Sequence, residues 1–98
     1  MQSLNGFPPG AKRRVGFELW QVQRGGMPDD FNPMSSAGAG VYEIRVHVEG
    51  EWRLLYVAKF AEAVYVLHAF AKKTRKTSKA DMEIAAQCYR QLLKERKA

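Results

Sequence analysis

The chain has 98 residues, of which 46% are hydrophobic and 27% are charged, so it has material for one modest hydrophobic core but not for two. Sixteen Lys and Arg residues against ten Asp and Glu give a formal net charge of +6 at pH 7. This basic balance is expected of a nucleic-acid-binding domain, although a merely soluble basic protein has the same composition. We therefore expect a single domain over residues 1–98 with a polyanionic partner, RNA above all.

Several classes of protein are excluded by the same inventory. The single cysteine, Cys88, cannot form an intrachain disulfide, and one Cys with two His gives no zinc-binding spacing. No run of about 18 apolar residues is present, and the first residues lack the apolar segment of a secretory signal. We expect a cytoplasmic protein that uses no metal and no cofactor and that does not bind a membrane.

Residues 9–24 have the pattern of an amphipathic helix. Pro9 suits a first turn, where its missing N–H would have no partner, and Gly25-Gly26 supplies a stop. Phe17 and Trp20 add a second apolar strip beside the main one. The positions at helical spacing on the main strip are Ala11, Val15, Leu19 and Val22.

Three strands are expected after a loop at residues 27–40, where prolines, glycines and small polar residues discourage regular structure. Residues 41–48 alternate between apolar and polar side chains, and residues 51–60 alternate less cleanly. Residues 63–71, AVYVLHAFA, are nearly all apolar. Such a run predicts a central strand that is covered on much of both faces.

The apolar pattern also predicts how these strands pair. A three-residue loop that ends in Gly50 keeps the apolar side chains on one face, and a two-residue turn at 61–62 continues the meander. One face then carries a set of cations: Arg45, Arg53, His68 and Lys72. The other face is expected to pack on the helices, and it collects Ile44, Val46, Trp52, Leu54, Tyr56, Tyr65, Leu67 and Ala69.

Residues 78–96 are expected to form the last helix, with Ser78 as the N-cap and Asp81 in capping-box position three residues later. Its apolar side is formed by Met82, Ala85, Cys88, Tyr89, Leu92 and Leu93. The predicted fold class is therefore α+β. It consists of a three-stranded antiparallel meander, with or without a further edge strand, between an N-terminal and a C-terminal helix.

The pairing of Arg45 with Arg53 requires an anion, because like charges directly opposite on neighbouring strands destabilise a sheet. A phosphate held between them is one candidate, and a carboxylate such as Glu43 or Glu51 is the other. Four cations within residues 72–76 favour the phosphate. Each cation that contacts a phosphate adds to RNA binding. The candidate RNA-binding residues are therefore cations on the strands, in the basic tract and close after it: Lys59, Lys72, Arg75, Lys76 and Lys79.

His68 has two interpretations: a hydrogen-bonded core residue, or a proton-transfer group beside Arg53. His47, near a turn, is expected to be solvated. The sequence contains no carboxylate pair, Gly-rich phosphate loop or Ser/His/Asp order. Metal-free RNA cleavage fits what remains, because the ribose 2′-OH attacks its own phosphate and the protein only aligns the backbone, moves protons and neutralises charge.

Four segments are similar to those of a known family: FPPGAKRR, PDDFNPM, RVHVEGEWRLLYVAKFAEAVYVLHAFAKKTRKT and SKADMEIA. Through them nearly the whole chain resembles the phage-derived branch of the RelE/HigB-like toxin family. It implies a toxin that cuts mRNA on the translating ribosome without metal and that is neutralised by a small antitoxin, often a helix-turn-helix protein. By position it implies that Arg53 holds the scissile phosphate, while Arg45 and Lys73 stabilise charge or assist proton transfer.

Two features depart from the family pattern. Several relatives use a Tyr near the C-terminus, whereas the first Tyr after Lys73 is Tyr89, on the expected core side; His68 is our candidate for part of that role. Family chains also usually begin with a strand, for which residues 1–7 are short.

Two other functions are alternatives to an mRNA-cleaving toxin. One is a non-catalytic RNA- or ribosome-binding module, and the other is a protein whose basic face serves only an acidic antitoxin.

Overall fold

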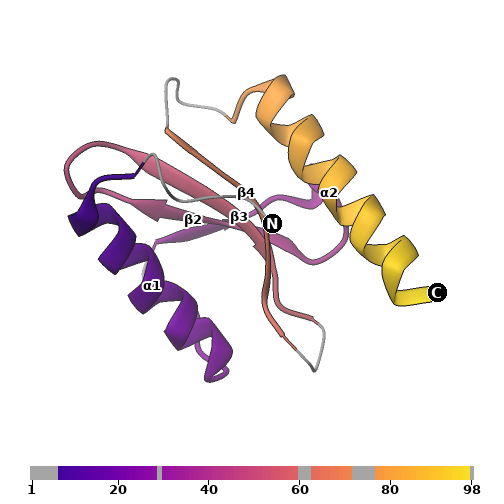
Figure 1. The fold of residues 1–98 in the computed structure, drawn as a ribbon, viewed down its shortest axis with the longest axis horizontal. Helices are drawn as coiled ribbons and strands as arrows, with labels where there is room; N and C mark the ends of the chain where they lie inside the picture. Colours follow the sequence, from indigo (N-terminus) through magenta and orange to yellow (C-terminus); the bar gives the residue numbers. More distant parts are fainter. Residues whose placement is uncertain (1–6, 29, 60–62, 72–76, 98) are drawn as a thin grey trace.

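The computed structural model describes residues 7–28, 30–59, 63–71 and 77–97. Its elements follow in the order α1 (Pro9–Gln23), β1 (Phe31–Pro33), a 3₁₀ turn η1 (Ser35–Ala37), β2 (Val41–Val46), β3 (Trp52–Val57), β4 (Tyr65–Ala71) and α2 (Lys79–Lys97). The strands form one antiparallel sheet in the order β1-β2-β3-β4, and the two helices lie on opposite sides of it (Figure 1). The predicted α+β class is confirmed.

Helix α1 covers one face of the sheet and begins where the sequence predicts, with Pro9 in its first turn. Its N-terminus lacks a side-chain cap from Pro8, the N-cap residue. The carboxylate of Glu49, in the β2–β3 turn, instead accepts a hydrogen bond of 3.0 Å from the backbone N–H of Gly10. The helix and that face of the sheet share one buried apolar cluster: Phe7, Ala11, Val15, Val22, Ile44, Val46, Leu54 and Tyr56.

The predicted pairing of the first two meander strands is confirmed. Arg45 is opposite Arg53, and Val46 is opposite Trp52. Gly50 has φ 126°, in the left-handed region that favours glycine, as expected at the end of a three-residue loop. This register is the one that keeps the apolar side chains of both strands on the same face of the sheet, which is why the sequence pattern predicts it.

Strand β4 departs from prediction in two ways. It lies at the edge of the four-stranded sheet rather than in its centre, although apolar side chains of both clusters cover it. The pairing is as predicted at Arg53–Phe70 and Leu55–His68, but a bulge follows and shifts it by one residue. Because a shift of one residue exchanges the faces, Tyr65 and Leu67 belong to the opposite core from the one predicted.

Helix α2 packs on the face that carries the arginines, so the prediction that one face packs on both helices is wrong. That face also carries apolar side chains, which are buried under α2. They form a second core, which consists of Val41, Leu55, Val57 and Leu67 with Ala37, Ala85 and Tyr89. The N-cap is confirmed, since the Ser78 hydroxyl accepts a hydrogen bond of 3.1 Å from the Asp81 N–H. The Tyr89 hydroxyl donates to the Ala39 carbonyl at 2.7 Å, which ties α2 to the segment before β2.

The segment at 27–40 is more ordered than a loop. Asn32 pairs with Glu43, so β1 is the further edge strand. Pro33 is compatible with this position because an edge strand leaves one side without ladder hydrogen bonds. Gly38, with φ 150°, lies against the ring of Tyr89, where a Cβ atom would overlap the ring.

We predict that Glu49→Ala lowers the free energy of unfolding by about 1 kcal/mol, because an N–H of the first turn of α1 loses its acceptor and the helix N-terminus loses a nearby negative charge. Glu49→Gln retains an acceptor oxygen and should lose less. Urea denaturation measures both, with Glu95→Ala on exposed α2 surface as the control. A Glu49→Ala protein as stable as the parent would show that this contact does not hold the helix start.

Candidate functional site

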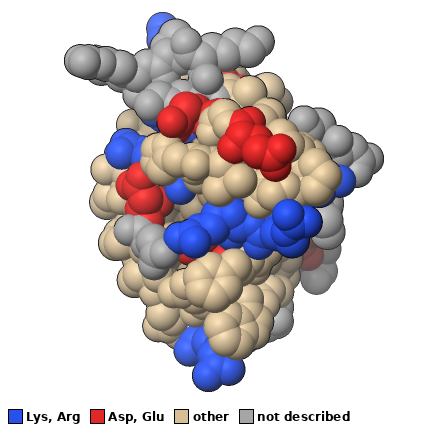
Figure 2. Space-filling view, turned by 90° about the vertical axis from the view of Figure 1, so that its left-hand side faces the viewer, with Lys and Arg blue, Asp and Glu red and all other residues tan. Residues whose placement is uncertain are grey.

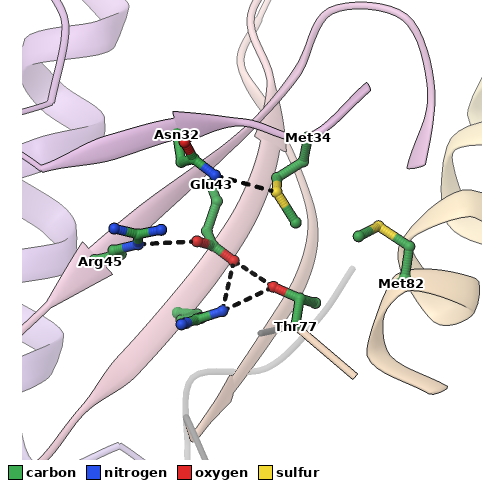
Figure 3. Close-up of a pocket in the computed structure, with 7 residues that line it drawn as sticks. Asn32, Met34, Glu43, Arg45, Thr77 and Met82 are labelled. Atoms are coloured by element: carbon green, nitrogen blue, oxygen red, sulfur yellow. Dashed lines mark hydrogen bonds and ion pairs between the residues drawn. The ribbon is translucent and has the colours of Figure 1, made fainter. Parts of the chain in front are cut away.

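A buried carboxylate lies at the centre of the arginine-bearing face. Glu43 is 0% exposed, and its Oε1 accepts a hydrogen bond of 3.1 Å from Arg45 Nε. Its Oε2 accepts from Arg53 Nη1 at 3.3 Å and from the Thr77 hydroxyl at 2.6 Å. Arg53 also donates to the Thr77 oxygen at 2.9 Å, so the four side chains form one connected network (Figure 3).

Strand geometry explains how the sequence builds this network. Glu43 and Arg45 are two residues apart on β2 and therefore point to the same face, and Arg53 is directly opposite Arg45 on β3. Thr77 reaches the same point from the residues just before α2. A carboxylate at 0% exposure is tolerated only with compensating hydrogen bonds and opposite charge, which the two guanidinium groups provide. The anion between the arginines in this structure is thus the carboxylate, the second of the two candidates.

The network forms one wall of a pocket of about 270 Å³. This volume is below the range typical of drug-sized ligands, about 300–1,000 Å³, and suits a small group such as a phosphate with its sugar. The two arginines differ in access, since the Arg45 side chain is 35% exposed and Arg53 only 3%. The residues that line the pocket are Asn32, Met34, Glu43, Arg45, Arg53, Thr77 and Met82 (Figure 3).

His68 lies on the same face but contacts a different partner. It is 8% exposed, its Nε2 is 2.7 Å from Asp81 Oδ1, and its ring stacks on Phe70 at 4.8 Å between centroids. It is not among the residues that line the pocket. The structure therefore shows the hydrogen-bonded core histidine that was one of the two interpretations, and it joins β4 to the first turn of α2.

Two of the candidate RNA-binding residues, Lys59 and Lys79, lie in the described part of the chain, at different distances from the arginines. Lys59 lies beyond the far end of β3, with Nζ 5.5 Å from the ring centroid of Tyr89. Six residues of extended chain place it about 20 Å from Arg53. Lys79 is exposed at the start of α2, two residues after Thr77. Four candidates fall outside the described residues: Lys72, Lys73, Arg75 and Lys76.

Some residues of the site were missed by sequence reasoning. Thr77, Asn32, Met34 and Met82 line the pocket, yet their residue types carry no signal of their own. Glu43 was considered only as an alternative, although a Glu two residues before Arg45 on a strand shares its face. Tyr89, the first Tyr after the basic tract, is 4% exposed and belongs to the core, as its helix position predicts.

A second charged group lies at the β2–β3 turn. His47 is half exposed, with Nε2 at 2.8 Å from Asp30 Oδ2 and with Nδ1 against the Glu51 carboxylate. The hydrogen bonds to Asp30 and then Glu51 raise the pKa of His47 above its usual value of 6.5, against a smaller opposing effect of burial. Asp30 Oδ1 is also 3.9 Å from Arg45, so this cluster adjoins the pocket.

The family of the chain follows from one comparison. A model of the phage-derived protein Gp49-like family (DUF891) matches residues 2–90. The chain belongs to this family. The Gp49-like family is a RelE-type toxin family, in agreement with the resemblance of the sequence. No curated protein and no solved structure matches the chain at a significant level.

The described part of the Gp49-like chain has neither a metal-binding cluster nor a membrane-spanning helix. It contains no cluster of three or more His, Cys, Asp or Glu side chains able to hold a metal ion. No helix there combines the length and the apolarity needed to cross a membrane.

We predict that Glu43→Gln lowers the free energy of unfolding by about 3 kcal/mol, because it removes the negative charge that pairs with the buried guanidinium of Arg53. The matched control is Glu83→Gln, whose carboxylate pairs with Arg90 on exposed surface of α2 and should cost less than about 0.5 kcal/mol. Urea denaturation of both variants gives the comparison. Equal losses would show that the network adds no more than a surface ion pair.

We also predict a pH-dependent contribution from His47. A raised pKa in the folded state means that protonation favours folding, so this stability is fully present below the unfolded-state pKa of about 6.5 and is lost as pH rises through the folded-state pKa. His47→Gln should therefore reduce stability at pH 5.5 more than at pH 8.5. Thermal or urea unfolding at the two pH values measures the difference. A constant difference would exclude a raised pKa for His47.

Proposed function

We propose that this Gp49-like chain is a ribosome-dependent mRNA endoribonuclease toxin of a type II toxin–antitoxin pair. The supporting observation is the convergence of Arg45 and Arg53, from neighbouring strands, at a pocket sized for a ribose-phosphate group. In the proposed reaction the ribose 2′-OH gives up its proton and attacks the adjacent phosphate, the bond to the 5′-oxygen of the next nucleotide breaks, and a proton passes to that leaving oxygen, so the products are a 2′,3′-cyclic phosphate and a 5′-OH. No metal or cofactor takes part.

The charges of the network suit this reaction. Two guanidinium groups against one carboxylate leave a net positive charge, and the phosphate develops a second negative charge in the transition state. Glu43 holds Arg45 by its Nε, and Asp30 lies 3.9 Å from Arg45 Nη1, so a phosphate that contacts the partly exposed terminal nitrogens would replace this longer ion pair. Arg45 is therefore assigned the direct contact, and Arg53 acts from beneath by fixing Glu43 and Thr77.

The other candidate residues take supporting roles in this proposal. Lys73 supplies further positive charge or a proton, and Lys72, Arg75, Lys76 and Lys79 bind the RNA backbone. His68 is a positioning residue, because its bond to Asp81 sets the start of α2 and hence the approach of Thr77. Lys59 binds RNA at a separate place, about 20 Å along β3 from the pocket.

The proposed partners are mRNA on the ribosome and a cognate antitoxin, a small helix-turn-helix protein. Membership of a RelE-type toxin family supports an antitoxin partner. The cationic composition supports RNA, since the chain carries a net charge of +6.

A second candidate function is a non-catalytic RNA- or ribosome-binding module. Two observations favour it: Glu43 already occupies the position between the arginines, and Tyr89 is fixed in the core. A module of this kind would bind ribosomes and leave the message intact.

We predict that Arg45→Ala lowers the rate of mRNA cleavage by about 100-fold, because one donor to the charged transition state is lost. Primer extension on mRNA incubated with translating ribosomes measures the new 5′ ends. The control is Arg90→Ala, which removes an equally charged side chain from exposed surface of α2. Arg53→Ala is less informative, because Arg53 is itself buried and bonds both Glu43 and Thr77, whereas Arg45→Ala leaves Glu43 its bonds to Arg53 and Thr77.

Thermal unfolding of both variants separates loss of cleavage from loss of fold: Arg90→Ala should match the parent, and Arg45→Ala should unfold at a lower temperature yet stay folded in the assay, because Glu43 keeps Arg53 and Thr77. An Arg45→Ala protein that cleaves as fast as the parent would refute the assigned role. A parent chain that binds ribosomes without producing new ends would support the binding module instead.

A further inference from the structure

The outer face of α1 presents two aromatic rings between two guanidinium groups. Phe17 is 46% exposed and Trp20 is 51% exposed, and their rings stack with centroids 6.1 Å apart. The Arg14 guanidinium lies 5.5 Å from the Phe17 centroid, and that of Arg24 lies 4.6 Å from the Trp20 centroid. We refer to these four side chains, Arg14, Phe17, Trp20 and Arg24, as the α1 ladder.

The α1 ladder itself carries positive charge at both ends. Figure 2 views the side of the molecule on which α1 lies and shows Lys and Arg atoms in a band and again at the lower tip, with uncharged surface between them and Asp and Glu atoms above the band. Glu18 is the one acidic residue in the α1 sequence, and it is buried with Oε1 at 3.4 Å from Arg14. This contact fixes Arg14 at one end of the ladder, and exposed Arg13 adds a further cation beside it.

Each ring contacts the other ring and one guanidinium, and each side chain is still about half exposed. A base of single-stranded RNA that stacked on either ring would compete with the guanidinium beside it. Aliphatic side chains can pack on the exposed ring surface and leave the guanidinium groups in place, and those groups suit carboxylates.

A second copy of the chain fits poorly on this surface. Two α1 helices packed face to face would bring guanidinium groups of both copies together, on molecules that each carry a net charge of +6. A partner with negative charge at both ends of an apolar strip is complementary. Arg14 and Arg24 are ten residues apart, about 15 Å along a helix axis, which matches carboxylates about ten residues apart on a second helix.

We propose that the α1 ladder is the docking surface for an amphipathic helix of a partner protein. The apolar stripe of that helix packs on Phe17 and Trp20, and its acidic residues pair with Arg14 and Arg24. The α1 ladder lies on the opposite side of the sheet from the Glu43 pocket, so both can be occupied together. This inference is independent of any RNA cleavage.

The test uses the full chain and two synthetic 18-residue helical peptides with the same leucine stripe. One peptide carries Glu at two positions ten residues apart, and the other carries Lys there. Isothermal titration calorimetry should show about fivefold tighter binding of the Glu peptide to the parent. Trp20→Ala should weaken that binding about thirtyfold, as loss of a central aromatic anchor does.

A charge reversal provides the matched control. Arg24→Glu should abolish the preference for the Glu peptide, because Arg14 and the new carboxylate then oppose each other, whereas Lys94→Glu, an equal charge change on exposed α2 surface, should keep the preference of the parent. Arg14 is left unchanged because it pairs with buried Glu18. An Arg24→Glu protein that still prefers the Glu peptide would overturn the proposal.

Two other results would also overturn it. One is binding of a ten-nucleotide oligouridine that Trp20→Ala weakens more than it weakens binding of the Glu peptide, which would indicate a nucleic-acid surface. The other is a parent dimer in sedimentation that Trp20→Ala converts to monomer, which would indicate self-association. Trp20→Ala should inhibit translation as the parent does, so failure of this inference and failure of the proposed nuclease activity can be told apart.

Discussion

The buried carboxylate of Glu43 is the interaction on which the rest of this arrangement depends. Without it, Arg45 and Arg53 would face each other across two strands with like charges, at the place where Thr77 and α2 must also pack. With it, three segments distant in the sequence are held at one point by hydrogen bonds of 2.6–3.3 Å. The same carboxylate keeps Arg53 buried and leaves Arg45 accessible, so it also decides which cation an incoming anion meets first.

Much of the fold could be predicted because its signals are local or strictly periodic. Residues 41–46 alternate, and Gly50 ends the turn, so only one pairing keeps the apolar set together; that pairing brings Arg45 and Arg53 together. The Ser78 cap of α2 depends on residues three apart. The site was predictable to the same extent, since its two arginines follow from the register.

The remainder could not be predicted because its signals are ambiguous or depend on distant contacts. In β4, apolar residues occupy both faces, so a one-residue shift at the bulge carries no penalty in the pattern. Strand β1 contains Pro33 and forms through its pairing with β2, which propensity does not reveal. The sequence favours a phosphate between the arginines, whereas the structure has the Glu43 carboxylate there, because the depth at which Glu43 is buried cannot be read from the pattern.

The bond from Tyr89 to Ala39 has a consequence for how this pocket can diversify. It joins α2, which carries Met82, to the segment that follows Met34. The two methionines that line the pocket therefore belong to one connected unit. The ionic groups Glu43, Arg45 and Arg53 belong to the central strands instead. Substitutions on α2 can therefore alter the width of the pocket while the charge of its ionic centre stays constant.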